Sequence, residues 1–129
     1  MSKNKTYWKP GLSVVNPLEL VRHEGIIISS SIGKDQRRPS VSFEVRRKND
    51  GKMDEFMIAY WSMLEDELFS TWEEVEAYRR KENVDVWAEV RSFYDDLGVR
   101  DHLSLIGKSV KGIYYRPRDA LVGIEKSNK

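Results

Sequence analysis

A basic hairpin is the first feature of this sequence that could carry chemistry. Residues 40–61 place an Asn49-Asp50-Gly51 turn and four cationic side chains between two apolar runs; the cations are Arg46, Arg47, Lys48 and Lys52. Guanidinium and ammonium groups bind phosphate oxygens, because they donate charge-assisted hydrogen bonds. The same side chains also keep a hairpin end soluble and stop strands of different molecules from pairing. The pattern therefore fits either a phosphate-binding surface or a solvated hairpin end.

The charge is distributed unevenly along the 129 residues, although the net charge is only +1. Residues 1–52 hold 11 basic and 5 acidic side chains, residues 53–101 hold 5 and 14, and residues 102–129 hold 6 and 2. The basic segments are mostly predicted strands and loops, whereas the acidic segment is mostly predicted helix. If the helices cover one face of a sheet, the opposite face and its loops should be net positive.

We expect such a basic face to bind nucleic acid, most readily single strands with little sequence preference. Cations would hold the phosphates and a tyrosine ring would stack on a base. If the neighbours Tyr114 and Tyr115 lie on a strand, one of them must face the core, because strand side chains alternate. The expected nucleic-acid-binding residues are Lys34, Arg37, Arg38, Arg46, Arg47, Lys48, Tyr114, Tyr115, Arg116 and Arg118.

A small protein-interaction module is the alternative, such as an inhibitor or adaptor that docks on a larger enzyme. The acidic surface of the helices, with Glu73, Glu76 and Glu89, would then approach a basic partner. Faces of opposite charge could also join two copies of the chain into a homodimer. The sequence leaves both kinds of partner open.

Catalytic and metal-binding motifs are missing from the sequence. The chain has no cysteine, which excludes a disulfide, a thiolate metal site and a cysteine nucleophile. No serine lies in a Gly-x-Ser-x-Gly elbow, and Gly107-Lys108-Ser109 lacks the first glycine of a Walker loop. The acidic run Glu65-Asp66-Glu67 points in different directions within one turn, which favours a solvated loop over a metal site. We therefore predict a protein that is not an enzyme and that needs no metal or cofactor.

Hydrophobic periodicity predicts the strands that must position the basic residues. The β-branched run over 25–32 and the alternating run over 41–47 indicate two strands, and Asn49-Asp50-Gly51 indicates the turn that follows. Residues 54–69 fit either a strand over about 54–61 or a helix, and the preceding turn favours the strand. Residues 110–115 and 120–125 predict a final hairpin.

Two amphipathic helices are predicted between these strands. A capping box of Thr71 and Glu74 begins the first, which runs to about Lys81. A wide apolar stripe marks the second, from Asn83 to Gly98. The predicted fold class is α+β: a mainly antiparallel sheet of about five strands, covered on one face by two amphipathic helices, in the order β-β-β-α-α-β-β.

The length predicts a single domain over residues 1–129. We expect an N-terminal arm at about 1–20, anchored by Tyr7 and Trp8, and a frayed tail at 127–129. The N-terminus is charged and has no apolar signal sequence, and no apolar run approaches the roughly 20 residues of a membrane span. The sequence therefore predicts no membrane partner and a cytoplasmic location.

Overall fold

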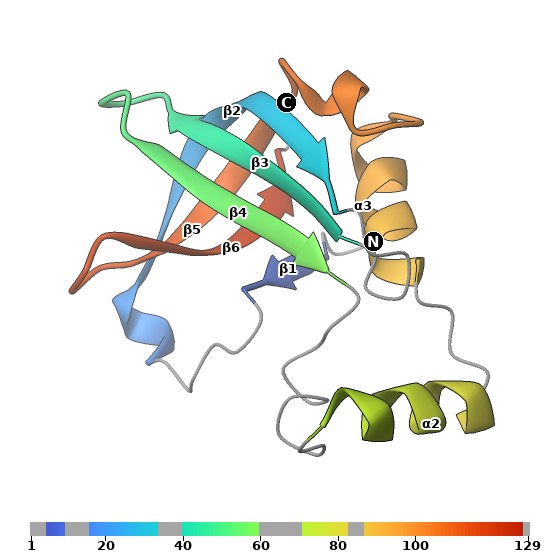
Figure 1. The fold of residues 1–129 in the computed structure, drawn as a ribbon. Coiled ribbons are helices and arrows are strands. Elements are labelled where there is room, and N and C mark those ends of the chain that lie inside the picture. The colour runs from blue at the N-terminus through green and yellow to red at the C-terminus, as the bar shows by residue number, and fades with distance from the viewer. Residues whose placement is uncertain (1–4, 10–15, 34–39, 60–70, 83–86, 128–129) are drawn as a thin grey trace.

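A computed structural model of the chain describes residues 5–9, 16–33, 40–59, 71–82 and 87–127. The strands in these ranges are β1 (Thr6–Trp8), β2 (Leu20–Ile32), β3 (Ser40–Arg47), β4 (Met53–Ala59), β5 (Ser109–Tyr115) and β6 (Ala120–Lys126) (Figure 1). The helices are α2 (Trp72–Glu82) and α3 (Ala88–Leu97), with short 3-10 helices η1 (Pro17–Glu19) and η2 (Leu103–Leu105).

The strands form one antiparallel sheet in the order β1-β6-β5-β2-β3-β4. The sheet curls into a half-barrel, so that β4 comes close to β6 although three strands separate them in that order (Figure 1). The long strand β2 shapes this curl, because it pairs with β5 along its first half and with β3 along its second. A bulge between Ile27 and Ser29 adds local twist. Gly25 lets β3 lie close to β2, since a Cβ there would lie 2.6 Å from Cγ1 of Val45.

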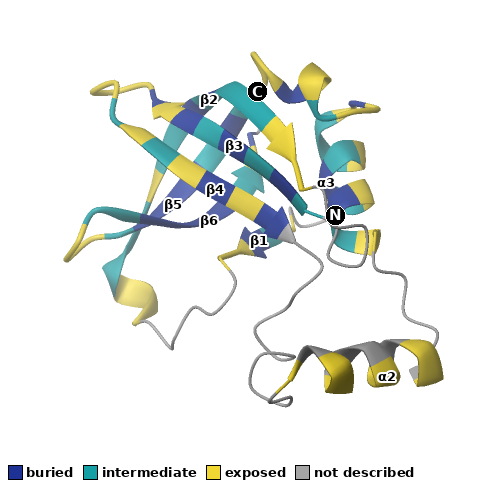
Figure 2. Ribbon diagram, viewed as in Figure 1, coloured by how far each residue is buried: buried dark blue, intermediate teal, exposed yellow. Residues whose placement is uncertain are grey.

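The predicted five-stranded sheet covered by two helices was wrong. The described residues contribute six strands to the sheet, because part of the expected arm, Thr6–Trp8, pairs with β6. Of the two helices, α3 packs against the sheet, while α2 is drawn apart from it in Figure 1. The described side chains of α2 are exposed, including Tyr78 (Figure 2). Ser127 of the expected frayed tail is also buried, and its hydroxyl donates to Glu24 at 2.9 Å.

Other local predictions agree with the structure. The strand interpretation of the ambiguous segment is confirmed over residues 54–59, which belong to β4, while residues 60–69 lie outside the described ranges. Gly98 ends α3 in the left-handed conformation with φ 68°, as expected. No helix in the described ranges has the length and apolar character needed to cross a bilayer.

Aromatic rings on the concave face of the sheet form the centre of the core. Phe43 of β3 stacks on Phe93 of α3 with ring centroids 5.2 Å apart, and Phe56 of β4 lies 5.9 Å from Phe43. Tyr7 of β1 packs edge-on against Phe93 at 5.2 Å. Three strands and the helix thus share one aromatic cluster, which accounts for the burial of this face in Figure 2.

Tyr7 also fixes α3 through its hydroxyl, which donates to Asp96 at 2.6 Å and lies 2.8 Å from Oγ of Ser92. Burial and the neighbouring Asp96 carboxylate both raise the pKa of this phenol, so it remains a hydrogen-bond donor at neutral pH. This contact stabilises the pairing of the three-residue strand β1 at the edge of the sheet.

Replacing Tyr7 with Phe should lower the free energy of unfolding by about 1–2 kcal/mol, because the ring stays buried while its two hydrogen bonds are lost. Urea denaturation measures this change. The control is Lys5→Ala, which removes an exposed ion pair with Glu89 and should change stability by less than about 0.5 kcal/mol. Equal effects of the two substitutions would contradict the role assigned to the hydroxyl.

Candidate nucleic-acid interface

A buried arginine joins the two hairpin turns at one end of the sheet. Arg47, the last residue of β3, donates to both carboxylate oxygens of Asp50, at 2.9 and 2.5 Å. It also donates to both oxygens of Asp119 in the β5–β6 turn, at 2.7 and 3.0 Å. Lys52 contacts Oδ2 of Asp119 at 3.1 Å and donates to its carbonyl oxygen. We call these four residues the hairpin clasp.

The clasp satisfies a charge that the fold removes from water. Arg47 is 5% exposed, and its guanidinium lies over the ring of Tyr114, 4.8 Å from the centroid. Four of its five N–H groups are represented in the bonds to the two carboxylates. The His23 ring packs edge-on against the Tyr114 ring, with centroids 5.3 Å apart. A buried guanidinium without these acceptors would be strongly destabilising.

The hydrogen bonds from Arg47 lower the pKa of both clasp carboxyl groups. Those bonds and a second from Lys52 bring the pKa of Asp119 to about 2. Bonds from Arg47 and from the backbone N–H of Lys52 hold the pKa of Asp50 well below its usual range. Burial raises the pKa of Tyr114 to about 12. Both carboxylates are therefore ionised at neutral pH, and Arg47 and Lys52 neutralise them.

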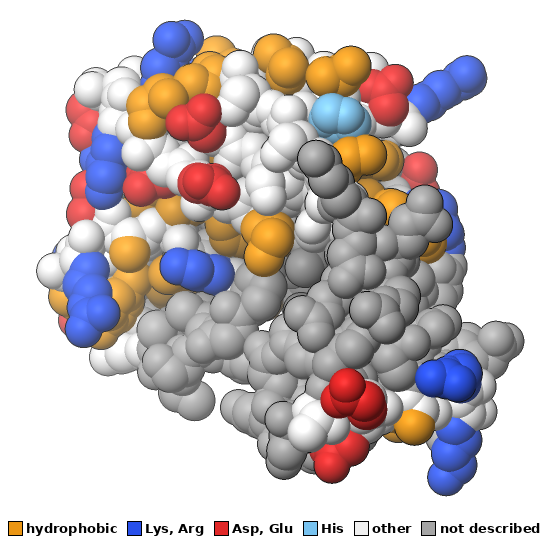
Figure 3. Space-filling model, viewed as in Figure 1, with side chains coloured by type: hydrophobic (Ala, Val, Ile, Leu, Met, Phe, Trp, Pro, Cys, Tyr) orange, Lys and Arg blue, Asp and Glu red, His pale blue; other side chains and the backbone are white. Residues whose placement is uncertain are grey.

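Surplus positive charge remains around the clasp. Residues 46–54 and 116–119 contain six cationic side chains and three carboxylates. Asp54, the third carboxylate, lies 4.0 Å from Lys52, and one of its oxygens is buried without a hydrogen bond. Within the described part of the chain, four exposed cations at this end have no ion pair; they are Arg46, Lys48, Arg116 and Arg118. Figure 3 shows Lys and Arg side chains projecting along this side of the molecule, with Asp and Glu side chains among them.

The structure brings together only part of the predicted site. Lys48, Arg116 and Arg118 lie in the two turns that the clasp joins, and Arg46 is exposed at the end of β3. Tyr115, at the end of β5, is half-buried. These five residues form the set that we call the hairpin end.

Two predicted residues have to be corrected, since Arg47 and Tyr114 are buried against each other and present no surface to a ligand. The alternation over 41–47 contained the signal for Arg47, because it places this residue on the inward face with Val45. Asp119 was missed because no local pattern relates it to Arg47. Three further predicted residues, Lys34, Arg37 and Arg38, lie outside the described ranges.

The outer face of the sheet carries mixed charge, in contrast to the expected positive face. Glu125 accepts a hydrogen bond from Arg22 at 2.9 Å, and Lys111 lies between Glu24 and Glu125 in the strand register. Glu44 lies directly opposite Glu55 on the neighbouring strand. The positive surplus is therefore a property of the hairpin end and does not extend across the sheet.

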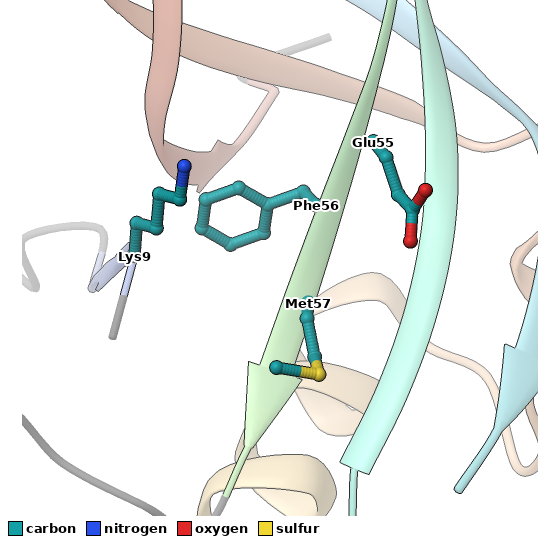
Figure 4. A pocket seen from close by; sticks show the side chains of 4 residues that line it. All are labelled: Lys9, Glu55, Phe56 and Met57. Atoms are coloured by element: carbon teal, nitrogen blue, oxygen red, sulfur yellow. The ribbon is translucent and has the colours of Figure 1, made fainter. Parts of the chain in front are cut away.

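A pocket of about 240 Å³ lies between the two edge strands and is lined by Lys9, Glu55, Phe56 and Met57. Figure 4 shows the Phe56 ring pointing toward Lys9, with Glu55 on the other side of β4. Its walls are mainly apolar, so it suits an apolar group better than a phosphate.

The one serine–histidine contact of the described residues has a structural explanation. Oγ of Ser30 lies 3.1 Å from Nδ1 of His102, but the hydroxyl donates its proton to the His102 carbonyl at 2.6 Å. The pair therefore ties β2 to the turn before η2 and does not activate a nucleophile. No three His, Asp or Glu side chains gather as metal ligands within the described ranges.

No protein-family model, curated protein or solved structure matches this chain. The arrangement of the chain's own residues is therefore the guide to its function.

The clasp predicts that stability depends on acid pH. Because folding lowers the pKa of Asp119, the stabilisation is complete above the ordinary aspartate pKa of about 3.9 and is lost as pH falls toward about 2. Urea denaturation over this interval should show a steeper loss of stability for the wild type than for Asp119→Asn. Equal pH slopes for the two proteins would show that Asp119 does not interact with Arg47 in solution.

Proposed function

We propose that the protein is a non-catalytic nucleic-acid-binding protein that holds single strands through the hairpin end. The observation that supports this function is the imbalance around the clasp. Arg47 and Lys52 form ion pairs with the carboxylates of both turns, whereas the exposed cations of the hairpin end have no ion pair among the described residues. These cations are therefore available to phosphates.

The chemistry of the hairpin end favours backbone contacts over base recognition. Arginine can bind two phosphate oxygens at once, and each phosphate that is neutralised releases counterions from the strand. Tyr115 is the tyrosine of the predicted pair that offers part of its ring to solvent. A base stacked on it contributes on the order of 1–3 kcal/mol, and single strands offer unstacked bases for this purpose. Binding of this kind depends strongly on salt and weakly on sequence.

The test of this function removes three cations at once: Lys48→Ala, Arg116→Ala and Arg118→Ala. Fluorescence anisotropy with a single-stranded oligonucleotide of about 16 nucleotides should show weaker binding by the triple variant. The slope of log K against log salt should fall by about 2, since each lost phosphate contact removes about 0.7.

The matched control carries Arg80→Ala, Arg100→Ala and Lys108→Ala, which remove three exposed cations outside the hairpin end. It has the same net charge as the triple variant, so only the position of the lost charges differs. Equal binding by the triple variant and the wild type would disprove the proposed function, and equal losses in both triple variants would show that binding has no preferred surface.

A protein partner is the second candidate function, and the edge strand β4 is the feature that favours it. β4 ends the sheet order, with no hydrogen-bonded neighbour on its outer side among the described strands. Met53 and Met57 on this strand are 45% and 42% exposed, and Met57 lines the apolar pocket. An unprotected edge with flexible apolar side chains can pair with an extended segment of another chain, including a second copy.

Replacing Met53 and Met57 with Lys would add charge to this edge and should abolish self-association or partner binding there. Sedimentation velocity compares the two proteins alone, and nucleic-acid binding is measured in parallel. If the wild type forms dimers that the double variant lacks, β4 is an interface. If both proteins sediment as monomers, self-association through β4 is excluded.

A further inference from the structure

Asp119 is the residue through which the clasp joins the two hairpins. Its carboxylate accepts hydrogen bonds from Arg47, 72 positions away, and from Lys52, 67 positions away. The bonds between Arg47 and Asp50 lie within the β3–β4 hairpin, since these residues are only three positions apart. Without the Asp119 carboxylate, the bond from Lys52 to the residue 119 carbonyl would therefore be the clasp's one remaining bond from turn to turn among the described contacts.

The backbone of Asp119 is also held in an uncommon conformation. Its φ is 51°, and it is the only non-glycine residue of the described ranges with a positive φ. Residues other than glycine avoid this region, although Asp tolerates it better than most. The carbonyl oxygen of Asp119 accepts from Lys52, so both the backbone and the side chain of this one residue are used to join the turns.

We propose that Asp119 is a positioning residue for nucleic-acid binding, because it holds the cations of both turns in one arrangement that a phosphate backbone can contact simultaneously. This inference depends on the proposed function of the hairpin end. A carboxylate near bound phosphates should weaken binding by charge repulsion alone. Asp119 is instead expected to strengthen binding, so the two effects have opposite signs and can be separated.

The physical reason is repulsion among the cations. Arg47 and Lys52 both contact the Asp119 carboxylate, which offsets the repulsion between them, and Arg116 and Arg118 belong to the same turn as Asp119. When that charge is removed, the bond from Lys52 to the residue 119 carbonyl remains, but the paired bonds from Arg47 that fix the β5–β6 turn against the β3–β4 turn are weakened or lost. We therefore expect the two arginines of the β5–β6 turn to be held less firmly. When a nucleic-acid strand contacts one turn, binding must then also order the other turn, which costs entropy. A preorganised site avoids this cost.

The first experiment compares Asp119→Asn with the wild type on the single-stranded oligonucleotide. We expect about tenfold weaker binding and a salt slope lower by about 1.4, which corresponds to two lost phosphate contacts. The salt slope is informative because a general loss of stability would reduce the amount of folded protein but would leave the salt slope unchanged. Binding by Asp119→Asn that equals or exceeds that of the wild type would overturn the inference.

Two controls carry the same change in charge. Asp50→Asn removes a clasp carboxylate but breaks only bonds within one hairpin, so binding should become tighter. Asp95→Asn lies on the exposed side of α3 and should not change binding. Weaker binding by Asp50→Asn to the same extent as by Asp119→Asn would overturn the assignment of the positioning role to the bond between the turns.

Asp119→Gly guards against misfolding of the Asn variant, because glycine adopts the positive φ readily while lacking the carboxylate. It should reproduce the lower salt slope, with thermal unfolding followed by circular dichroism to confirm that the protein is folded. A wild-type slope in Asp119→Gly would overturn the inference. The outcome also separates the two proposals: no binding by the wild type disproves the proposed function, whereas binding by the wild type with unchanged Asp119 variants disproves only the positioning role.

Discussion

The burial of one guanidinium is the constraint on which this end of the molecule depends. The guanidinium of Arg47 stays charged, and it cannot reach solvent while Arg47 remains in β3. The fold must therefore place hydrogen-bond acceptors next to it. Asp50 is supplied by the turn that follows directly, but the remaining N–H groups need a second carboxylate. Asp119 is that carboxylate, and it can reach Arg47 only if the β5–β6 turn lies against the β3–β4 turn. The curl of the half-barrel and the pairing of these turns are consequently parts of one arrangement.

The same constraint decides which charges are free. The two acidic residues of the turns are used inside the clasp, and the cations that flank them are left on the surface. Counting charges along the sequence could not reveal this division, because Arg46, Arg47 and Lys48 are neighbours with different surroundings. One is exposed at the end of a strand, one is buried and one lies in the turn. The surplus of positive charge is therefore small and local, whereas the sheet as a whole carries mixed charge.

Local signals in the sequence predicted the parts of the fold that neighbouring residues determine. The hairpin turn at Gly51, the alternation along β3 and the end of α3 at Gly98 all follow from backbone preferences or from burial on a fixed period. The placement of β1 and α2 depends on distant contacts. The three-residue strand β1 is held at the sheet edge by the contacts of Tyr7 with Ser92 and Asp96 of α3, which are far away in the sequence. An apolar stripe on a helix likewise does not indicate which surface will cover it. The contact between the two turns could not be predicted from the sequence for the same reason, because it joins residues far apart in the chain.

Stability alone is a weak explanation for the clasp. In a buried network of charges, much of the Coulomb attraction only offsets the cost of removing the charges from water. Well-packed apolar side chains of similar volume often give equal or greater stability. An apolar replacement of Arg47 and Asp119 could pack the turns together, yet it would not fix their relative orientation through paired, directional hydrogen bonds. It would also remove the carboxylate that contacts both Arg47 and Lys52 and offsets the repulsion between them. A charged clasp is thus the arrangement that both fixes the turns and keeps several cations close together, and these are the two properties that a phosphate-binding surface requires.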